Sequence, residues 1–346
     1  MPFRIEIGST ANEALAAEVS RRWNSLTKPP GSLGRLESLV AQLAMITGEA
    51  RPRVDRKAMA VFCADHGVTA EGVSAYPREV TAQMVKNFLA GGAAITVLCR
   101  QFGISPFIVD AGVDSEPAPG VIDLRAGRGT ANLAKGPAMS RPDAERALEN
   151  GVGFARRIRE SYDIAGVGEM GIGNTTSASA LLCAYTGLEA SDAVGPGTGL
   201  GATGVQWKAE VVGGALQLHR ACIVGGDPID ILAALGGFEI ATMAGFLLGA
   251  AANRMPVVVD GFIASAAALA ARAISPQVME YLLFSHMSAE PAHRRLLTEL
   301  GARPILDLDM RLGEGSGAAM AMPVLDGAIA LYSKMATFAE GGVSEA

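Results

Sequence analysis

The sequence has few charged residues and few aromatic ones. Charged side chains make up 18% of the 346 residues and aromatic side chains 5%, and the formal net charge is −6. A net negative charge argues against general affinity for nucleic acid or an anionic membrane, although one helix N-terminus could still bind a phosphate. The scarcity of aromatic side chains leaves neither a stacking platform for bases nor an aromatic belt.

Metal-binding and nucleophile motifs are also missing. The four cysteines lie far apart with no C-x-x-C pair, which argues against disulfides and a cysteine-based zinc site. Of the four histidines, none has metal-ligand spacing to another, and no H-E-x-x-H occurs. The motifs G-x-S-x-G and G-x-x-x-x-G-K-[ST] are absent as well. We therefore expect neither a metal ion nor a cofactor.

Hydrophobic runs of the kind that span a membrane are lacking too. The uncharged run between Glu239 and Arg254 is too short for the ~20 residues that a spanning helix needs. The run at 170–188 is long enough, but it carries the polar sequence N-T-T-S near its start. Residues 1–6, M-P-F-R-I-E, contain no apolar run typical of a signal peptide. We expect a soluble, cytoplasmic protein.

Short apolar runs alternate with helix-length segments from residue 57 onward. The runs at 58–63, 106–109, 255–259 and 281–284 are each followed by polar residues or glycine. Continuous apolar runs of this length are typical of parallel strands buried on both faces, and ligands gather at the carboxyl ends of such strands. The pattern predicts an α/β fold with three α/β/α layers and a mostly parallel, open, Rossmann-like sheet.

Helices are expected on both sides of this region. Residues 11–26 and 36–46 have helical spacing of apolar side chains, and the prolines at 29 and 30 separate them. Ala/Gly-rich segments at 79–102, 209–221, 228–252 and 264–273 predict helices that pack closely on the sheet. The stretch 112–142 is rich in glycine and proline, and we interpret it as irregular, with room for a short hairpin.

Two glycine motifs suggest nucleotide chemistry. G-x-G-x-x-G occurs at 166–171 and at 199–204, but with 42 glycines in the chain the motif carries little weight. A dinucleotide site also needs a strand just before the motif, and residues 163–165 are a poor strand. An NAD-dependent oxidoreductase therefore stays an alternative only. A second interpretation takes 169–179 as a glycine-rich loop with N-capping residues at 174–176 before a helix at 178–185. The N–H groups of such a helix start could bind one phosphate, and Lys208, which follows the glycine-rich loop 195–201, could bind the same phosphate. The alternative is an ordinary capped helix.

The segment 304–323 contains the clearest candidate for catalysis. Glu314 lies between Gly313 and Gly315, so the backbone beside the carboxylate is bare and a ligand can approach closely. Few charges surround it apart from Arg311, and an apolar environment raises the proton affinity of a carboxylate, as a general base requires. A glycine-rich turn with a solvated glutamate is the alternative.

Several of these segments together resemble one family over almost the whole chain. The chain is similar to the nicotinate-nucleotide:5,6-dimethylbenzimidazole phosphoribosyltransferase family, which makes α-ribazole phosphate for the lower ligand of cobalamin. The matching stretches are T-K-P-P-G-S-L-G-R-L-E (27–37), A-D-H-G-V-T-A-E-G-V-S-A-Y-P (64–77), V-T-A-Q-M-V (80–85), G-E-M-G-I-G-N-T-T (168–176), G-P-G-T-G-L (195–200), S-H-M-S-A-E-P-A-H (285–293) and L-G-E-G-S-G-A (312–318).

The resemblance implies roles for particular residues. Glu314 would be the general base that takes the proton from the benzimidazole N–H. The base pocket would contain Ser74, Tyr76, Gln83, Met84 and Leu312. The site of the nucleotide and its phosphate would contain Glu169, Gly171, Asn174, Thr175, Lys208 and Ser288.

The resemblance also implies an organisation and a set of partners. Residues 56–320 would form an α/β catalytic domain. The chain ends, residues 1–55 and 321–346, would pack together as a small, mainly helical subdomain. The protein would be a homodimer that binds nicotinate mononucleotide and a benzimidazole-type base, without nucleic acid or membrane. A non-catalytic nucleotide-binding module on the same scaffold is a further alternative.

Overall fold

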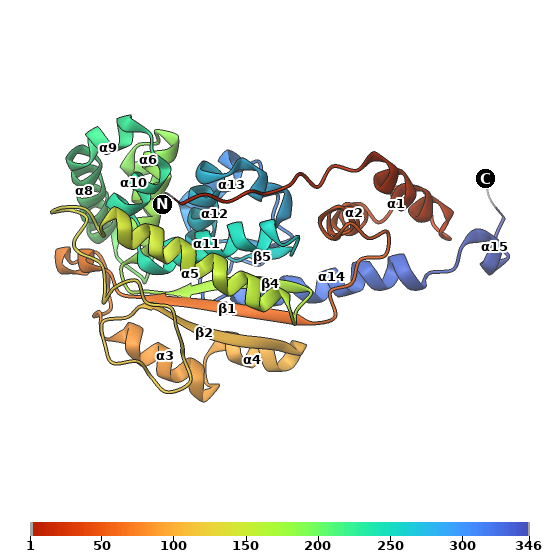
Figure 1. Ribbon diagram of the computed structural model, residues 1–346, viewed down its shortest axis with the longest axis horizontal. Coiled ribbons are helices and arrows are strands. Elements are labelled where there is room, and N and C mark those ends of the chain that lie inside the picture. The colour runs from red at the N-terminus through yellow and green to blue at the C-terminus, as the bar shows by residue number, and fades with distance from the viewer. Residues whose placement is uncertain (1–2, 345–346) are drawn as a thin grey trace.

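The computed structural model describes residues 3–344 and has a six-stranded sheet at its centre. The strand order is β3-β2-β1-β4-β5-β6, and every neighbouring pair is parallel. The strands are β1 Lys57–Ala64, β2 Ile104–Gly112, β3 Ile122–Asp123, β4 Ile164–Met170, β5 Val257–Val259 and β6 Leu282–Phe284. A separate parallel pair consists of β7 His286–Met287 and β8 Leu306–Asp307. The predicted open parallel sheet is confirmed (Figure 1).

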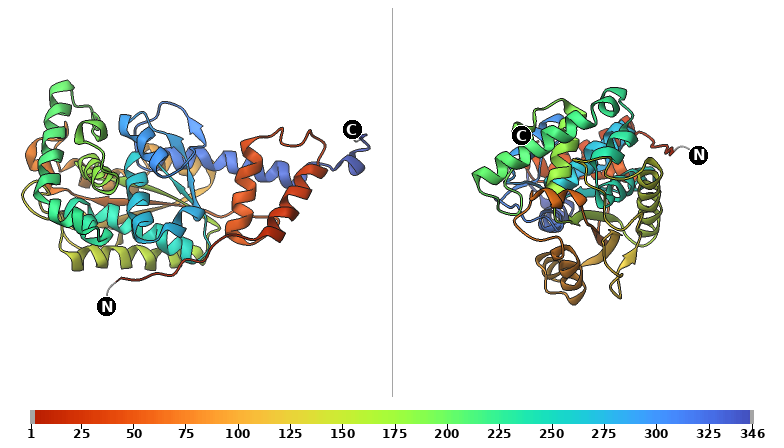
Figure 2. Two further views of the ribbon diagram at one scale, coloured as in Figure 1. Left: turned by 90° about the horizontal axis from the view of Figure 1, so that it is seen from above. Right: turned by 90° about the vertical axis from the view of Figure 1, so that its left-hand side faces the viewer.

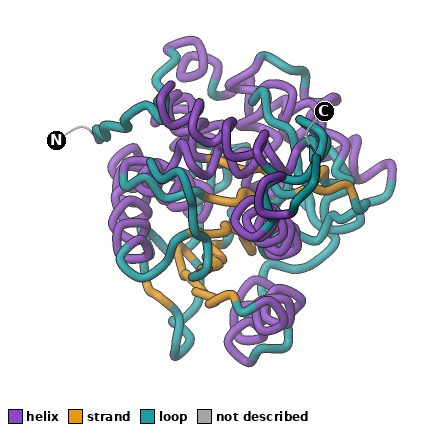
Figure 3. The backbone as a smooth tube through the Cα atoms, turned by 90° about the vertical axis from the view of Figure 1, so that its right-hand side faces the viewer, coloured by secondary structure: helices purple, strands orange, loops and turns teal. Residues whose placement is uncertain are grey.

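Helices cover both faces of the sheet, which confirms the three layers. Helices α5, α11 and α12 pack on one face, and α3, α4 and α14 on the other (Figure 1). The strands are enclosed between them (Figure 3). The helices are α1 Glu13–Ser25, α2 Arg35–Thr47, α3 Val80–Ala90, α4 Ala94–Phe102, α5 Arg141–Arg159, α6 Asn174–Thr186, α7 Ala190–Ala193, α8 Ala202–Leu218, α9 Arg220–Gly225, α10 Pro228–Leu235, α11 Phe238–Ala252, α12 Phe262–Ile274, α13 Pro291–Glu299, α14 Ser316–Lys334 and α15 Phe338–Gly341, with 3-10 turns η1 Gly67–Glu71 and η2 Pro276–Tyr281.

Strand β4 corrects the expectation that 163–165 is a poor strand. It pairs with β1 on one side and β5 on the other, so it is a central strand. Its glycines have low strand propensity, so the sequence pattern did not predict a strand. They are needed because other parts of the chain pack closely against the backbone of β4. A Cβ atom added at Gly168 would lie 2.1 Å from the backbone nitrogen of Gly315. Strand β3 pairs in parallel with β2, so the stretch 112–142 contributes a parallel edge strand and not the hairpin for which room was expected.

Several helix boundaries also differ from expectation. The segment 79–102 forms α3 and α4, which separate at Gly91, where φ is 78°. The segment is apolar enough by composition to cross a membrane, with a mean hydropathy of 1.2 over its best window. Helices α10 and α11 replace the single helix expected at 228–252, and α8 and α9 the one at 209–221. No helix was expected at 141–159, where α5 lies.

A second, smaller core lies beyond the N-terminal ends of the strands. It joins α1, α2 and the C-terminal part of α14 at the right-hand end of the molecule (Figures 1 and 2). Its fully packed members are Leu15, Val19, Trp23, Leu26, Val40, Ala44, Ala328 and Tyr332. The extended segment before α1 runs back along the large domain, where Thr10 N–H and Oγ1 donate hydrogen bonds to Glu280. The division at 55 and 320 stays a prediction, and α14 runs across its second boundary.

Candidate active site

A cavity of about 530 Å³ opens at the carboxyl ends of β4 and β5. The loop 311–314 forms one wall, the turn before α6 another, and α3 and the loop containing Tyr76 the outer side. This is the edge of a parallel sheet at which ligands bind, because loops from several strands converge there. The predicted site residues that line it are Tyr76, Met84, Glu169, Gly171, Asn174, Thr175, Ser288, Leu312 and Glu314.

Glu314 is held on a tight turn at the mouth of this cavity. Its φ is 64°, which is in the left-handed region that a non-glycine residue rarely adopts. The glycines on either side also have positive φ, 85° at Gly313 and 92° at Gly315. Only 7% of the residue is exposed, and burial raises the pKa of its carboxyl group. The N–H of Ile95, at the start of α4, donates a long hydrogen bond of 3.4 Å to Oε2 and opposes that shift. The alternative of a solvated glutamate is therefore not what the structure shows.

A second buried carboxyl group, that of Glu169, lies beside this turn. A Cβ atom added at Gly313 would lie 2.5 Å from Oε1 of Glu169. Burial, with the nearby charges of Asp260 and Glu239, raises the pKa of Glu169 to about 8. The side-chain amide of Asn174 donates a hydrogen bond to Oε2 and works against that rise. At neutral pH Glu169 is therefore mostly a neutral acid next to Glu314.

The opposite wall contains the start of helix α6, with a buried lysine behind it. Helix α6 begins at Asn174, not at 178, so the residues expected as N-caps form its first turn and Gly173 is the cap. Lys208 is 1% exposed, and Nζ donates hydrogen bonds to Oγ1 of Thr175 and the carbonyl oxygen of Gly195, which are both uncharged. Burial lowers the pKa of Lys208 to about 8, and Glu290 partly offsets this. A buried ammonium beside a helix N-terminus favours a bound anion.

Three predicted residues lie outside the cavity wall. Lys208 is behind Thr175 and acts on the cavity through it. Ser74 bonds Thr198, which lines the cavity, with 3.1 Å between their hydroxyl oxygens. Gln83 is exposed on α3, one residue before Met84.

Sequence reasoning missed several polar residues of the site. His286, Glu290 and Arg311 line the cavity, and none of them was among the predicted site residues. Asp260 lies just behind the wall and is 1% exposed. A signal for two of them was present, because Asp260 directly follows the apolar run that becomes β5, and His286 lies two residues after the run that becomes β6.

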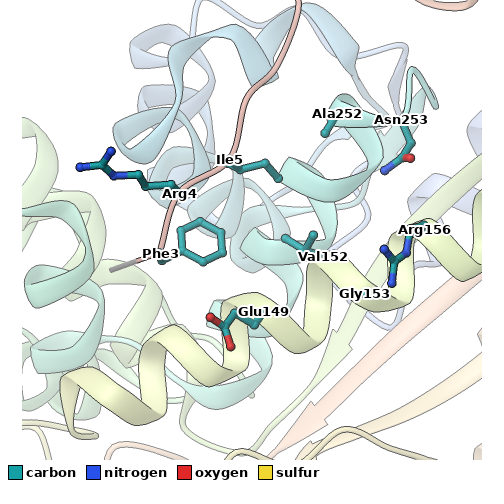
Figure 4. A pocket seen from close by; sticks show the side chains of 9 residues that line it. All are labelled: Phe3, Arg4, Ile5, Glu149, Val152, Gly153, Arg156, Ala252 and Asn253. Carbon is teal, nitrogen blue, oxygen red and sulfur yellow. The ribbon is translucent and has the colours of Figure 1, made fainter. Parts of the chain in front are cut away.

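A larger hollow of about 790 Å³ lies elsewhere, between the N-terminal segment and helices α5 and α11 (Figure 4). Its polar groups are the side chains of Arg4, Glu149, Arg156 and Asn253, which come from its different walls. It shares no lining residue with the cavity at the strand ends, and none of its side chains is a buried ionisable group. Within residues 3–344, no group of three or more His, Cys, Asp and Glu side chains could hold a metal ion.

An open parallel sheet with a polar cavity at the carboxyl ends of its strands is the architecture of an α/β enzyme. The chain belongs to the phosphoribosyltransferase family, whose sequence profile matches residues 9–343. This confirms the predicted resemblance.

Relatives and a solved structure agree with this membership over nearly the whole chain. The nicotinate-nucleotide–dimethylbenzimidazole phosphoribosyltransferase of Solidesulfovibrio magneticus is 52% identical, over 93% of this chain and 92% of that protein. The enzyme of the same name from Cupriavidus necator is 51% identical over 97% of each chain. A crystal structure of the Thermus thermophilus enzyme has a TM-score of 0.91, with 44% identity over 97% of this chain and 100% of that one.

Proposed function

We propose that the protein transfers the phosphoribosyl group of nicotinate mononucleotide to 5,6-dimethylbenzimidazole or a related base. The products are nicotinate and α-ribazole 5′-phosphate, the nucleotide of the cobalamin lower ligand. The observation that carries the proposal is one cavity that is lined by Glu314 and by Thr175, with the buried Lys208 directly behind Thr175. The names of the relatives supply the two substrates.

The chemistry fits the groups in the cavity. The ring nitrogen of nicotinate mononucleotide is a pyridinium, so nicotinate leaves C1′ with the bonding electron pair and needs no proton. The azole nitrogen attacks C1′ from the opposite face, which converts a β-nucleotide into an α-nucleotide. Glu314 takes the proton that the attacking azole loses. A positioned base contributes about 10²–10⁴-fold, and proximity within one cavity contributes much of the remainder.

The remaining site residues divide between the two substrates. Tyr76, Met84 and Leu312 line the cavity, where they would contact the planar base. Ser74 and Gln83 would act from just outside it. The phosphoribosyl part would be held by Gly171, Asn174, Thr175, Lys208 and Ser288, with Glu169 next to it in the nucleotide site.

Other parts of the proposal concern the assembly and its setting. We expect a cytoplasmic homodimer that has no affinity for nucleic acid or membranes. The net charge of −6 supports the part of the proposal that concerns nucleic acid and anionic lipid.

A product assay tests the function. Purified protein is incubated with nicotinate mononucleotide, with and without 5,6-dimethylbenzimidazole, and the released nicotinate and the anomeric form of the new nucleotide are measured. We expect nicotinate release only with the base present, and an α-nucleotide in equal amount. Release without a base, a β-product, or no turnover would refute the proposal.

A further inference from the structure

The turn that presents Glu314 has no capping group of its own. Gly315 is the N-cap of α14, and glycine has no side chain that could accept hydrogen bonds from the first N–H groups of the helix. A larger residue is excluded there by the backbone, because φ is 92°, and by space, because an added Cβ atom would lie 2.7 Å from the sulfur of Met59. The cap must therefore come from elsewhere in the chain.

Asp260, which follows β5, supplies that cap. Its Oδ2 accepts a hydrogen bond of 3.1 Å from Gly315 N–H, and its Oδ1 accepts one of 3.0 Å from Ala318 N–H. These are the N-cap and N3 positions of the helix, the two N–H groups that a capping box satisfies with two separate side chains. Here the single carboxylate of Asp260 makes both bonds. Burial raises the pKa of the Asp260 carboxyl group, whereas the nearby His286 and these two N–H groups lower it and so favour the carboxylate.

We propose that Asp260 is a positioning residue for Glu314, whose carboxylate caps α14 and so keeps the turn 313–315 in its left-handed conformation. A non-glycine residue with positive φ is strained and persists only where surrounding contacts fix it. The hydrogen bond from Gly315 N–H to Asp260 fixes the position of the peptide group that directly follows Glu314. This inference rests on the proposed function, in which Glu314 takes the proton from the attacking base.

Asp260 also acts on Glu314 through its charge. It is one of the causes, after burial, that raise the pKa of the Glu314 carboxyl group. Other charged or titratable groups face the same cavity: Glu169 at the end of β4, His286 in β7, Tyr76 and Glu290 in loops, and Arg311 in the same loop as Glu314. Helix α4 contributes the N–H of Ile95. Replacing Asp260 by a neutral residue removes one negative charge and lowers the pKa of Glu314.

The test uses Asp260→Asn in the full chain. An asparagine has nearly the same shape, but only one of its two terminal atoms accepts a hydrogen bond, so one of the two N–H groups faces another donor. We expect kcat for the transfer to fall about a hundredfold, the effect of a reacting group misplaced by about 1 Å. The acidic limb of the pH–rate profile should also move to lower pH, which a general loss of stability would not cause.

A matched control is Asp227→Asn. Asp227 caps α10 by accepting from the N–H groups of Ile229 and Asp230, and it lies outside the cavity. Asparagine is as good an N-cap as aspartate, so this variant should keep the wild-type kcat and pH profile. The same chemical change is then compared at two helix caps, of which only one touches the Glu314 turn.

Amide hydrogen exchange of the peptide that spans 311–320 gives a readout independent of activity. We expect faster exchange in Asp260→Asn than in the wild type and in Asp227→Asn. Unchanged exchange together with wild-type kcat would overturn the inference, as would a lower kcat with both the acidic limb and the exchange unmoved. If the wild type itself transfers nothing, the proposed function is wrong, and the exchange result alone decides whether Asp260 holds the turn.

Discussion

Lys208 and Thr175 are linked by a hydrogen bond of 2.7 Å from Nζ to Oγ1, and this bond joins α8 to the first turn of α6. Both hydrogen-bond partners of Nζ are neutral, and Glu290 is the nearby carboxyl group whose charge favours the ammonium form. The lowered pKa of Lys208, about 8, leaves it mainly cationic at neutral pH. A buried cation is costly without compensating charge, and the phosphate of a nucleotide would add to that of Glu290.

The first prediction replaces this charge by Lys208→Met. A hydrogen bond to a charged group contributes about 1.5–3 kcal/mol, so the KM for nicotinate mononucleotide should rise about tenfold to a hundredfold. Nicotinate riboside has no phosphate, and its kcat/KM should be low in the wild type and change little in the variant. Steady-state kinetics with both substrates measures this. Lys334→Met at the end of α14 is the control, and equal effects on nucleotide and riboside would contradict a phosphate contact.

The second prediction concerns Glu314→Gln. The amide keeps the shape and the contact with Ile95 N–H, but it cannot accept the proton of the azole. We expect the fold to persist and the transfer rate to fall about 10²–10⁴-fold. Circular dichroism and single-turnover assays measure the two parts of this expectation. Glu49→Gln, on the exposed end of the loop after α2, is the control, and wild-type turnover by Glu314→Gln would refute the role of a general base.

Much of the sheet could be predicted from the sequence because local composition specifies it. Strands buried on both faces require continuous apolar runs, and the runs at 58–63 and 106–109 lie inside β1 and β2. Strand β4 could not be found in this way. Its glycines at 166 and 168 are poor strand formers, and they are required only because Met59 and the turn at 314–315 press against them. A contact with a distant segment overrides the local preference.

The site shows the same division between local and distant causes. Glycines on both sides of a carboxylate are a local signal, and Glu314 does lie on a bare turn at the cavity. The cap from Asp260 depends on the sheet bringing the end of β5 to the start of α14, and nothing near residue 260 indicates it. The glycine motif at 166–171 was a weak signal for nucleotide binding, because its residues belong mostly to β4, where the glycines serve packing.

The third prediction tests this packing with Gly168→Ala. The added Cβ atom would lie 2.1 Å from the nitrogen of Gly315, so either β4 or the Glu314 turn has to move. Overpacking of this kind costs about 1–3 kcal/mol, and we expect lower stability together with a lower transfer rate, although no polar group is removed. Denaturant unfolding and kinetics measure both effects. The control, Gly214→Ala within α8, meets nothing within 4 Å and should stabilise the protein by about 0.5–1 kcal/mol.

The fourth prediction links Glu169 to the pH dependence of stability. The pKa of Glu169 is about 8 in the folded protein, against an ordinary value of 4.5, so between these pH values the folded state binds more protons than the unfolded state. The free energy of unfolding therefore falls as pH rises from about 4.5 to about 8, because the folded protein must either keep the proton or bury a charge. Glu169→Gln removes this titration and retains an oxygen that accepts from Asn174. Thermal unfolding at pH 5 and pH 8 should show a smaller loss of Tm in this variant than in the wild type, whereas Glu49→Gln should behave as the wild type does. Identical pH dependence in all three proteins would mean that Glu169 titrates normally. It would then be ionised at neutral pH and not a neutral acid next to Glu314.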